Sequence, residues 1–163
     1  MAEVIMTCGR LCSGKSTYAQ RMRKDKKAVV LSIDEITLAL FKNEAGDMLD
    51  EYVERTRKYL YEKSVELIET GINVVLDWGF WTADERQYAR GFYGSRGIKC
   101  GLHYLDISAE EWQRRIDKRN EAVKAGKCSA YFVDEGLAAK FRDIFEIPSD
   151  DEIDVYINTE NGI

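Results

Sequence analysis

Short apolar runs alternate with segments of helical periodicity along the chain. The runs predict five strands, at residues 4–8, 28–32, 72–77, 98–105 and 153–158. Between them, apolar residues spaced by three and four predict helices that start near residue 14 and cover about 34–41, 47–70, 82–94 and 134–145, with one more opening at 108. Alternating strands and helices favour a parallel sheet with helices on both faces. We therefore predict an α/β three-layer sandwich in one domain, residues 1–163.

Two helix starts carry the sequence signature of a capping box. Thr82 is followed three residues later by Glu85, and Ser108 by Glu111. In this motif the hydroxyl accepts a backbone N–H of the first turn, and the acid reaches back to the N–H of the capping residue. Both helices are therefore expected to begin at these residues.

A phosphate-binding motif directly follows the first apolar run. Residues 9–17 read GRLCSGKST and match G-x-x-x-x-G-K-[ST], the P-loop or Walker A signature, in full. Its backbone N–H groups and the following helix N-terminus surround a phosphate chain, while Lys15 reaches the β- and γ-phosphates and Ser16 contacts Mg²⁺. The predicted nucleotide-binding residues are Gly9, Cys12, Ser13, Gly14, Lys15, Ser16 and Thr17.

Composition narrows the class of protein further. The chain has 45% hydrophobic residues and a single proline, and its apolar runs are shorter than the roughly 20 residues of a membrane span. Four cysteines without a CxxC pair and one histidine suggest neither a zinc site nor a disulfide framework. The net charge of −5 gives no overall attraction to nucleic acid. We expect a cytoplasmic protein with no membrane partner.

Two acids follow apolar strands and are expected to meet the P-loop. Ligands of a parallel sheet gather beyond the carboxyl ends of the strands, where Asp34 and Asp77 are predicted to lie. There the two carboxylates bind the metal, orient the acceptor or accept its proton. Two alternatives stay open: Asp34 as a plain helix N-cap, and Asp77 as an acid paired with a nearby arginine.

A basic helix precedes the last strand. Arg115 and Arg119 are spaced i, i+4 and share a face, as a lid over a transferred phosphoryl group requires. Arg114 lies on a different face. The segment from about 108 to 145 is the candidate lid, and the alternative is a solvated basic face balanced by neighbouring acids.

Phe80, Trp81 and Arg86, which follow Asp77 in the sequence, are candidates for contacts with the acceptor. Phe80 and Trp81 either wall that pocket or pack in the core. Arg86 either anchors the acceptor or pairs with an acid.

Together these residues resemble an AAA-type group of small P-loop kinases, which includes the kinase domain of polynucleotide kinase, zeta-toxin kinases and chloramphenicol phosphotransferase. The P-loop, Asp34, Asp77, the Arg115–Arg119 helix and the sequence FEIPSDDE at 145–152 carry the resemblance. It implies a nucleoside-monophosphate-kinase-like strand order 2-3-1-4-5, and Asp34 as the general base. Residues 35–40 lack the arginine with which polynucleotide kinases grip the acceptor's 3′ phosphate.

The sequence therefore predicts a kinase that transfers the γ-phosphoryl group of ATP to a hydroxyl of a small molecule. Lys15, Asp34, Arg115 and Arg119 are the predicted catalytic residues, Ser16 and Asp77 the Mg²⁺ ligands, and Asp34, Asp77, Phe80, Trp81 and Arg86 the acceptor contacts. The alternatives are a 5′-hydroxyl polynucleotide kinase, with nucleic acid as a less favoured partner, and an ATP-binding regulatory module without an acceptor.

Overall fold

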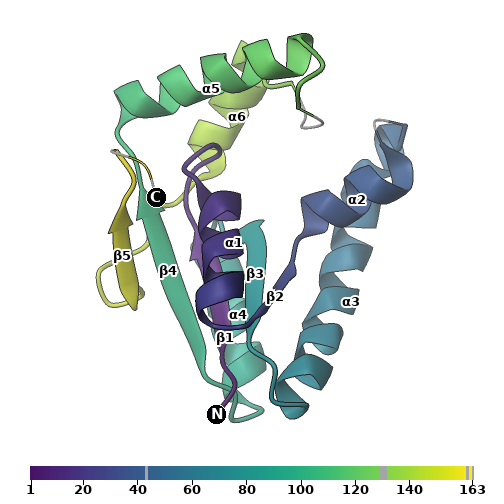
Figure 1. The fold of residues 1–163 in the computed structure, drawn as a ribbon, viewed down its shortest axis with the longest axis vertical. Helices are drawn as coiled ribbons and strands as arrows, with labels where there is room; N and C mark the ends of the chain where they lie inside the picture. The colour runs from purple at the N-terminus through teal and green to yellow at the C-terminus, as the bar shows by residue number, and fades with distance from the viewer. Residues whose placement is uncertain (43, 129–131, 161, 163) are drawn as a thin grey trace.

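Five parallel strands form one sheet in the order β2-β3-β1-β4-β5, as Figure 1 shows for a computed structural model of the protein. The structure describes all residues except 43, 129–131, 161 and 163. The strands are β1 (Val4–Cys8), β2 (Val29–Leu31), β3 (Val74–Gly79), β4 (Cys100–Asp106) and β5 (Val155–Asn158). The predicted fold class and strand order are confirmed.

Helices surround this sheet on both faces and at its carboxyl end. They are α1 (Lys15–Asp25), α2 (Ile33–Phe41), α3 (Leu49–Glu69), α4 (Ala83–Gly94), α5 (Ala109–Lys124) and α6 (Glu135–Ile144), with a short 3₁₀ turn, η1 (Gly46–Met48), before α3. In Figure 1, α1 lies in front of the sheet and α4 behind it, while α5 crosses above the ends of the strands. The loops that follow β1 and β3 therefore open toward α5.

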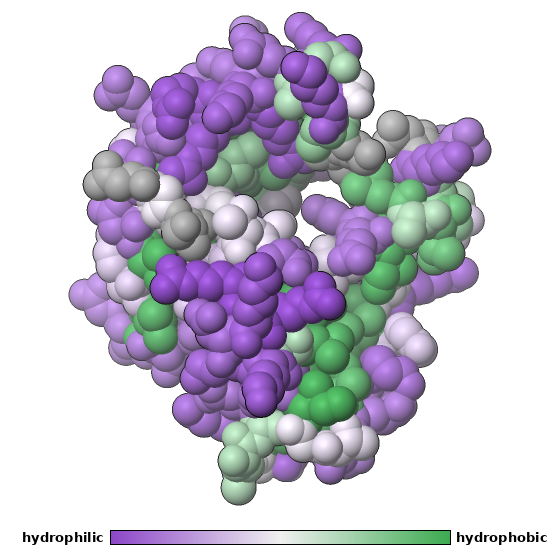
Figure 2. All heavy atoms as spheres, in the orientation of Figure 1, coloured by the Kyte–Doolittle hydropathy of each residue, from purple (hydrophilic) through white to green (hydrophobic). Residues whose placement is uncertain are grey.

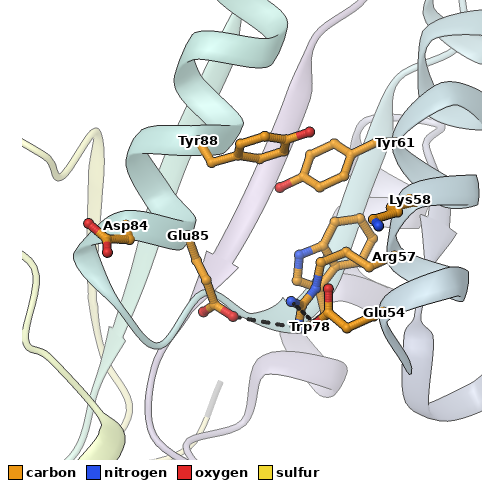
Figure 3. Close-up of a pocket in the computed structure, with 8 residues that line it drawn as sticks. All are labelled: Glu54, Arg57, Lys58, Tyr61, Trp78, Asp84, Glu85 and Tyr88. Atoms are coloured by element: carbon orange, nitrogen blue, oxygen red, sulfur yellow. Dashed lines mark hydrogen bonds and ion pairs between the residues drawn. The ribbon is translucent and has the colours of Figure 1, made fainter. Parts of the chain in front are cut away.

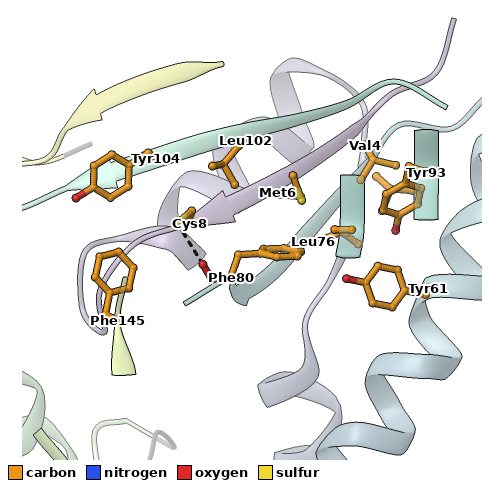
Figure 4. Close-up of a cluster of buried hydrophobic side chains, with 12 residues drawn as sticks. Val4, Met6, Cys8, Tyr61, Leu76, Phe80, Tyr93, Leu102, Tyr104 and Phe145 are labelled. Carbon is orange, nitrogen blue, oxygen red and sulfur yellow. Dashed lines mark hydrogen bonds between the residues drawn. The ribbon is translucent and has the colours of Figure 1, made fainter. Parts of the chain in front are cut away.

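The alternation of side chains along β1 assigns one core cluster to each face of the sheet. Val4, Met6 and Cys8 pack on the face that also buries Tyr61 of α3 and Tyr93 of α4 (Figure 4). On the opposite face, a second cluster joins β1, β3 and β4 to α1 and contains Ile5, Tyr18, Ala19, Met22, Val75 and Leu105. Since β1 is buried on both faces, its sequence reads as a continuous apolar run.

Element boundaries differ from the predicted ones at two places that affect the site. Strand β3 continues to Gly79, so Asp77 lies within the strand and not at its end. Helix α2 begins at Ile33, and Ser32 caps it by accepting a hydrogen bond from the N–H of Glu35. The alternative reading of Asp34 as the N-cap is therefore wrong, because this residue already lies in the first turn.

Only one of the two predicted capping boxes is complete. At α4, Thr82 accepts from the N–H of Glu85, and Glu85 accepts from the N–H of Thr82. At α5, Ser108 accepts from the N–H of Glu111, but the carboxylate of Glu111 binds Arg114 and Arg115 instead. The N–H of Ser108 donates to Glu160 at 2.6 Å, so a more distant acid completes this cap.

A buried ion pair ties α4 to the turn before β5. Arg86 is only 2% exposed and donates to both carboxylate oxygens of Glu152, at 2.8 and 3.2 Å. It also donates to the carbonyls of Phe80 and Glu146. Of the two readings of Arg86, the structure supports the pairing with an acid, because four of its five N–H donors are engaged within the described residues and its side chain is buried.

No helix among the described residues is long and apolar enough to cross a membrane.

We predict that the Arg86–Glu152 pair makes stability depend on acid pH. The Arg86 hydrogen bond, helped by Ser149, lowers the pKa of Glu152 from 4.5 to about 2. A depressed pKa adds stability that is present above the unfolded value and is lost as the pH falls through the folded one. Glu152→Gln is therefore expected to lower the free energy of unfolding by roughly 2–3 kcal/mol at pH 7. Urea titrations between pH 7 and 2 should show this difference closing below about pH 4.

The matched control for this experiment is Asp143→Asn, because Asp143 is 76% exposed and its ion pair within the described residues is with its neighbour Arg142. This substitution should change the free energy of unfolding by no more than about 0.5 kcal/mol at every pH. Equal stability of Glu152→Gln and the unmodified protein at pH 7 would contradict the assignment.

Candidate functional site

The P-loop connects β1 to α1 in a conformation that requires its glycines. Gly14 caps α1 with φ at 99°, a left-handed conformation, and no side chain caps the first N–H groups of this helix. At Gly9, an added Cβ would lie 2.6 Å from Ser13 Oγ and 2.7 Å from the carbonyl oxygen of Leu105. The loop therefore lies tightly against β4 and leaves the N-terminus of α1 open to an anion.

Lys15 extends back over this loop. Its ammonium group donates to the carbonyls of Gly9 at 2.9 Å and Arg10 at 2.6 Å. Burial lowers the pKa of Lys15, and the charge of Asp77 is the main opposing influence. The cation is thus held where a phosphate chain at the helix N-terminus would meet it.

Asp77 lies beside the loop and is 9% exposed. It accepts a hydrogen bond from the hydroxyl of Thr7 at 3.4 Å, from the neighbouring strand β1. Among the described residues no ion pair joins Asp77 to an arginine, so the alternative reading of this acid is not supported. Thr7 was not predicted to take part, although a hydroxyl in the apolar run before the P-loop was a usable signal.

Asp34 faces the same group of charges from the first turn of α2. Loss of surrounding water raises the pKa of its carboxyl group, and the negative charge of Asp77 raises it further. The charges of Lys15 and Arg119 act in the opposite direction. Residues from β3, α1 and α5 thus influence one carboxylate on α2, which is the convergence that the strand-end argument predicts.

The two predicted lid arginines occupy different environments. Arg115 donates to Glu111 at 2.7 Å, to the carbonyl of Ser13 at 3.4 Å and to the carbonyl of Thr159. Arg119 approaches the sulfur of Cys12 at 3.7 Å, and its Nε is buried without a hydrogen-bond partner in the described part of the chain. Arg115 is therefore a brace between α5, the P-loop and the end of β5, whereas Arg119 still offers a donor beside the loop.

Helix α5 is anchored on the P-loop by a residue that was not predicted. Trp112 is 4% exposed and donates from its indole nitrogen to the carbonyl of Leu11 at 2.7 Å. A small apolar cluster surrounds this contact and consists of Ile107, Trp112, Ile116 and Val133, with Leu11 and Cys12 packed against it. The space-filling view shows a hollow between α5 and α2, next to the end of α1 that carries the P-loop (Figure 2).

The two aromatic residues predicted to contact the acceptor also occupy different environments. Phe80 has no exposed surface, adopts a φ of 47° and packs against Trp78, so it belongs to the core and not to a pocket wall. Trp81 is half-buried, and its ring meets Phe141 of α6 edge to face at 4.8 Å. Of the three predicted acceptor contacts after Asp77, Trp81 remains a candidate, because Phe80 is packed in the core and Arg86 is buried in its ion pair with Glu152.

The donor set fits a magnesium ion that shares its coordination with phosphate. Ser16 lies exposed in the first turn of α1, and Asp77 supplies a carboxylate next to the loop. In the described part of the chain no group of three or more His, Cys, Asp or Glu side chains is arranged to hold a metal. Mg²⁺ in phosphate sites commonly uses one or two protein oxygens plus substrate phosphates, so this sparse set is sufficient.

Comparisons with known proteins identify the family and the fold. Residues 4–143 match the family described as an AAA domain. A sugar kinase from Janibacter sp. HTCC2649 aligns with a TM-score of 0.66 at 17% identity, covering 97% of this chain and 86% of its own. The APS kinase CysC of Mycobacterium tuberculosis, solved with AMPPNP and APS, aligns with a TM-score of 0.67 at 20% identity, covering 96% and 88%.

A third structure, the Pnkp1/Rnl/Hen1 RNA repair complex, aligns with a TM-score of 0.71 at 23% identity, covering 88% of this chain and 43% of its own. The TM-scores of these three alignments show a shared fold. No curated protein matches the sequence. The predicted resemblance to small P-loop kinases is confirmed at the level of family and fold.

We predict that Gly9→Ala weakens nucleotide binding at least tenfold, because its Cβ collides with Ser13 and with the backbone of β4. Titration calorimetry with a non-hydrolysable ATP analogue measures this loss. Gly91→Ala is the matched control, since a Cβ there meets nothing within 4 Å and the residue lies inside α4. Unchanged affinity of Gly9→Ala would show that the loop does not hold the nucleotide.

Proposed function

This chain belongs to the AAA domain family, and on that premise we propose that it is an ATP-dependent kinase whose acceptor is a hydroxyl group of a small molecule. In this proposal residues 1–163 act as one kinase domain, and the segment from about 108 to 145 forms the lid. The observation that carries the proposal is the P-loop itself, with Lys15 hydrogen-bonded over it, Arg119 in contact with its Cys12 and Asp77 on the neighbouring strand.

The loop and Lys15 hold and position the phosphate chain. Gly14 leaves the N-terminus of α1 open, and Lys15 is already directed over the loop. Ser16 and Asp77 would hold Mg²⁺, which would supply positive charge to the phosphate oxygens. Phosphoryl transfer depends mainly on such positioning and charge stabilisation, and a helix N-terminus with a buried cation supplies both.

Asp34 is the proposed general base. A carboxylate with a raised pKa holds a proton more strongly than an ordinary aspartate, which favours abstraction from a hydroxyl group during transfer. The nearby charge of Asp77 contributes to this shift, so Asp77 supports the base in addition to its role at the metal.

Arg119 is the proposed cation for the transferring group. Its buried Nε has no partner among the described residues, and its guanidinium already contacts Cys12 inside the loop. Arg115 is assigned a positioning role, because its donors bind Glu111 and the carbonyls of Ser13 and Thr159.

A 5′-hydroxyl polynucleotide kinase is the second candidate, favoured by the likeness to the RNA repair complex. The net charge of −5 and the absence of an arginine from residues 35–40 count against it. A small hydroxyl compound is therefore the preferred acceptor.

We predict that Asp34→Asn lowers phosphoryl transfer by a factor of about 10²–10⁴ while leaving ATP binding intact, because the amide cannot accept the proton. A screen with γ-labelled ATP across nucleosides, oligonucleotides, sugars and antibiotics identifies the acceptor and gives the rate. Glu35→Gln is the matched control, since Glu35 is the neighbouring exposed acid in the same helical turn.

Three outcomes of this screen are informative. Undiminished transfer by Asp34→Asn would exclude this residue as the base. Transfer only to oligonucleotides would favour the polynucleotide kinase. Binding of ATP without transfer to any acceptor would favour the regulatory module.

A further inference from the structure

A second cavity lies on the other side of the sheet from the P-loop charges. Its volume is about 340 Å³, and it is lined by Glu54, Arg57, Lys58, Tyr61, Trp78, Asp84, Glu85 and Tyr88, from α3, β3 and α4 (Figure 3). Cavities of this size bind small organic molecules. None of the residues assigned to the kinase site lines it.

The alternation of β3 separates this cavity from the kinase site. Asp77 bonds to Thr7 beside the P-loop, whereas the next residue, Trp78, packs on the face covered by α3 and α4. Its ring meets Tyr61 edge to face, with centroids 5.5 Å apart. A molecule bound against Trp78 therefore occupies a different face of the sheet from the carboxylate of Asp77.

Aromatic rings form the walls of this cavity. Tyr61 is 4% exposed and fixed, and the rings of Trp78 and Tyr88 are each inclined at 72° to it. Tyr88 is 59% exposed, so its ring stands at the mouth (Figure 3). Flat rings bind to such surfaces by stacking or by edge-to-face contact.

The lining of the cavity carries two cationic donors, Arg57 and Lys58, and three carboxylates, Glu54, Asp84 and Glu85. The carboxylates of Glu54 and Glu85 are engaged by Arg57, at 2.6 and 3.5 Å, and Glu85 also accepts from backbone N–H groups at the start of α4. The Nε of Arg57 is buried and lacks a partner within the described residues. Figure 3 shows the Asp84 side chain directed away from the other residues of the cavity. Lys58 takes part in no ion pair within the described residues, so an oxygen or nitrogen acceptor of a ligand can meet its ammonium group.

We propose that this cavity is a second binding site, for a planar ring that carries carbonyl or carboxylate oxygens at one edge. The ring contacts Tyr61, Trp78 and Tyr88, and the oxygens accept from Arg57 and Lys58. Two kinds of compound share this chemistry, a pyrimidine base with ring carbonyls and an aromatic carboxylate.

Titration calorimetry tests the proposal with the full chain saturated by Mg²⁺ and a non-hydrolysable ATP analogue. The probes are uridine, benzoate and benzylamine. Benzylamine has the same phenyl ring as benzoate but carries a positively charged ammonium group in place of the carboxylate. We expect uridine or benzoate to bind and benzylamine not to bind, and whichever probe binds identifies the source of the oxygens. Because the readout is binding and not phosphoryl transfer, failure here leaves the proposed kinase activity unaffected, and the reverse also holds.

Tyr88→Ala should weaken binding of the probe about tenfold, as expected for the loss of one stacking ring. Tyr59→Ala is the matched control, because Tyr59 is a 62% exposed tyrosine of α3 that does not line the cavity. Lys58→Gln should weaken benzoate more than uridine. Thermal unfolding verifies that each variant is folded.

The proposal is overturned if neither oxygen-bearing probe binds at millimolar concentration, if benzylamine binds as well as benzoate, or if Tyr88→Ala and Tyr59→Ala bind alike.

Discussion

The pairing of β1 with both β3 and β4 is the constraint on which the rest of the site depends. Pairing with β3 places Thr7 beside Asp77, and pairing with β4 places the backbone of Leu105 beneath Gly9. The P-loop begins where β1 ends, so its position relative to both neighbours is fixed by a strand buried on both faces. Rigid support of this kind gives a site the accuracy that phosphoryl transfer requires.

Much of this arrangement was predictable because it depends on local signals. Apolar runs located the strands, the glycine pattern located the P-loop, and Thr82 with Glu85 located the start of α4. Strand order followed from the family resemblance and not from any run of residues. The convergence of Asp34 and Asp77 was also predictable, because parallel strands bring their carboxyl ends to one edge.

The remaining assignments depend on partners that lie far away in the sequence. Arg115 and Arg119 share a helix face. The carbonyls of Ser13 and Thr159 nevertheless accept hydrogen bonds from Arg115 and not from Arg119. The sequence could not decide whether Arg86 contacts the acceptor or pairs with an acid, because its partner Glu152 lies 66 residues later. Burial of Phe80 likewise follows from the packing of α3 and α4 over β3, which no short pattern specifies.

The contact between Trp112 and Leu11 has a consequence for the way in which the proposed lid opens. This hydrogen bond and the apolar cluster around it make the first turns of α5 and the P-loop one rigid unit. Lifting this part of α5 would expose Trp112 and leave a carbonyl without its donor, which is energetically costly. Opening of the proposed lid therefore leaves the first turn of α5 on the P-loop, and the motion begins beyond Trp112.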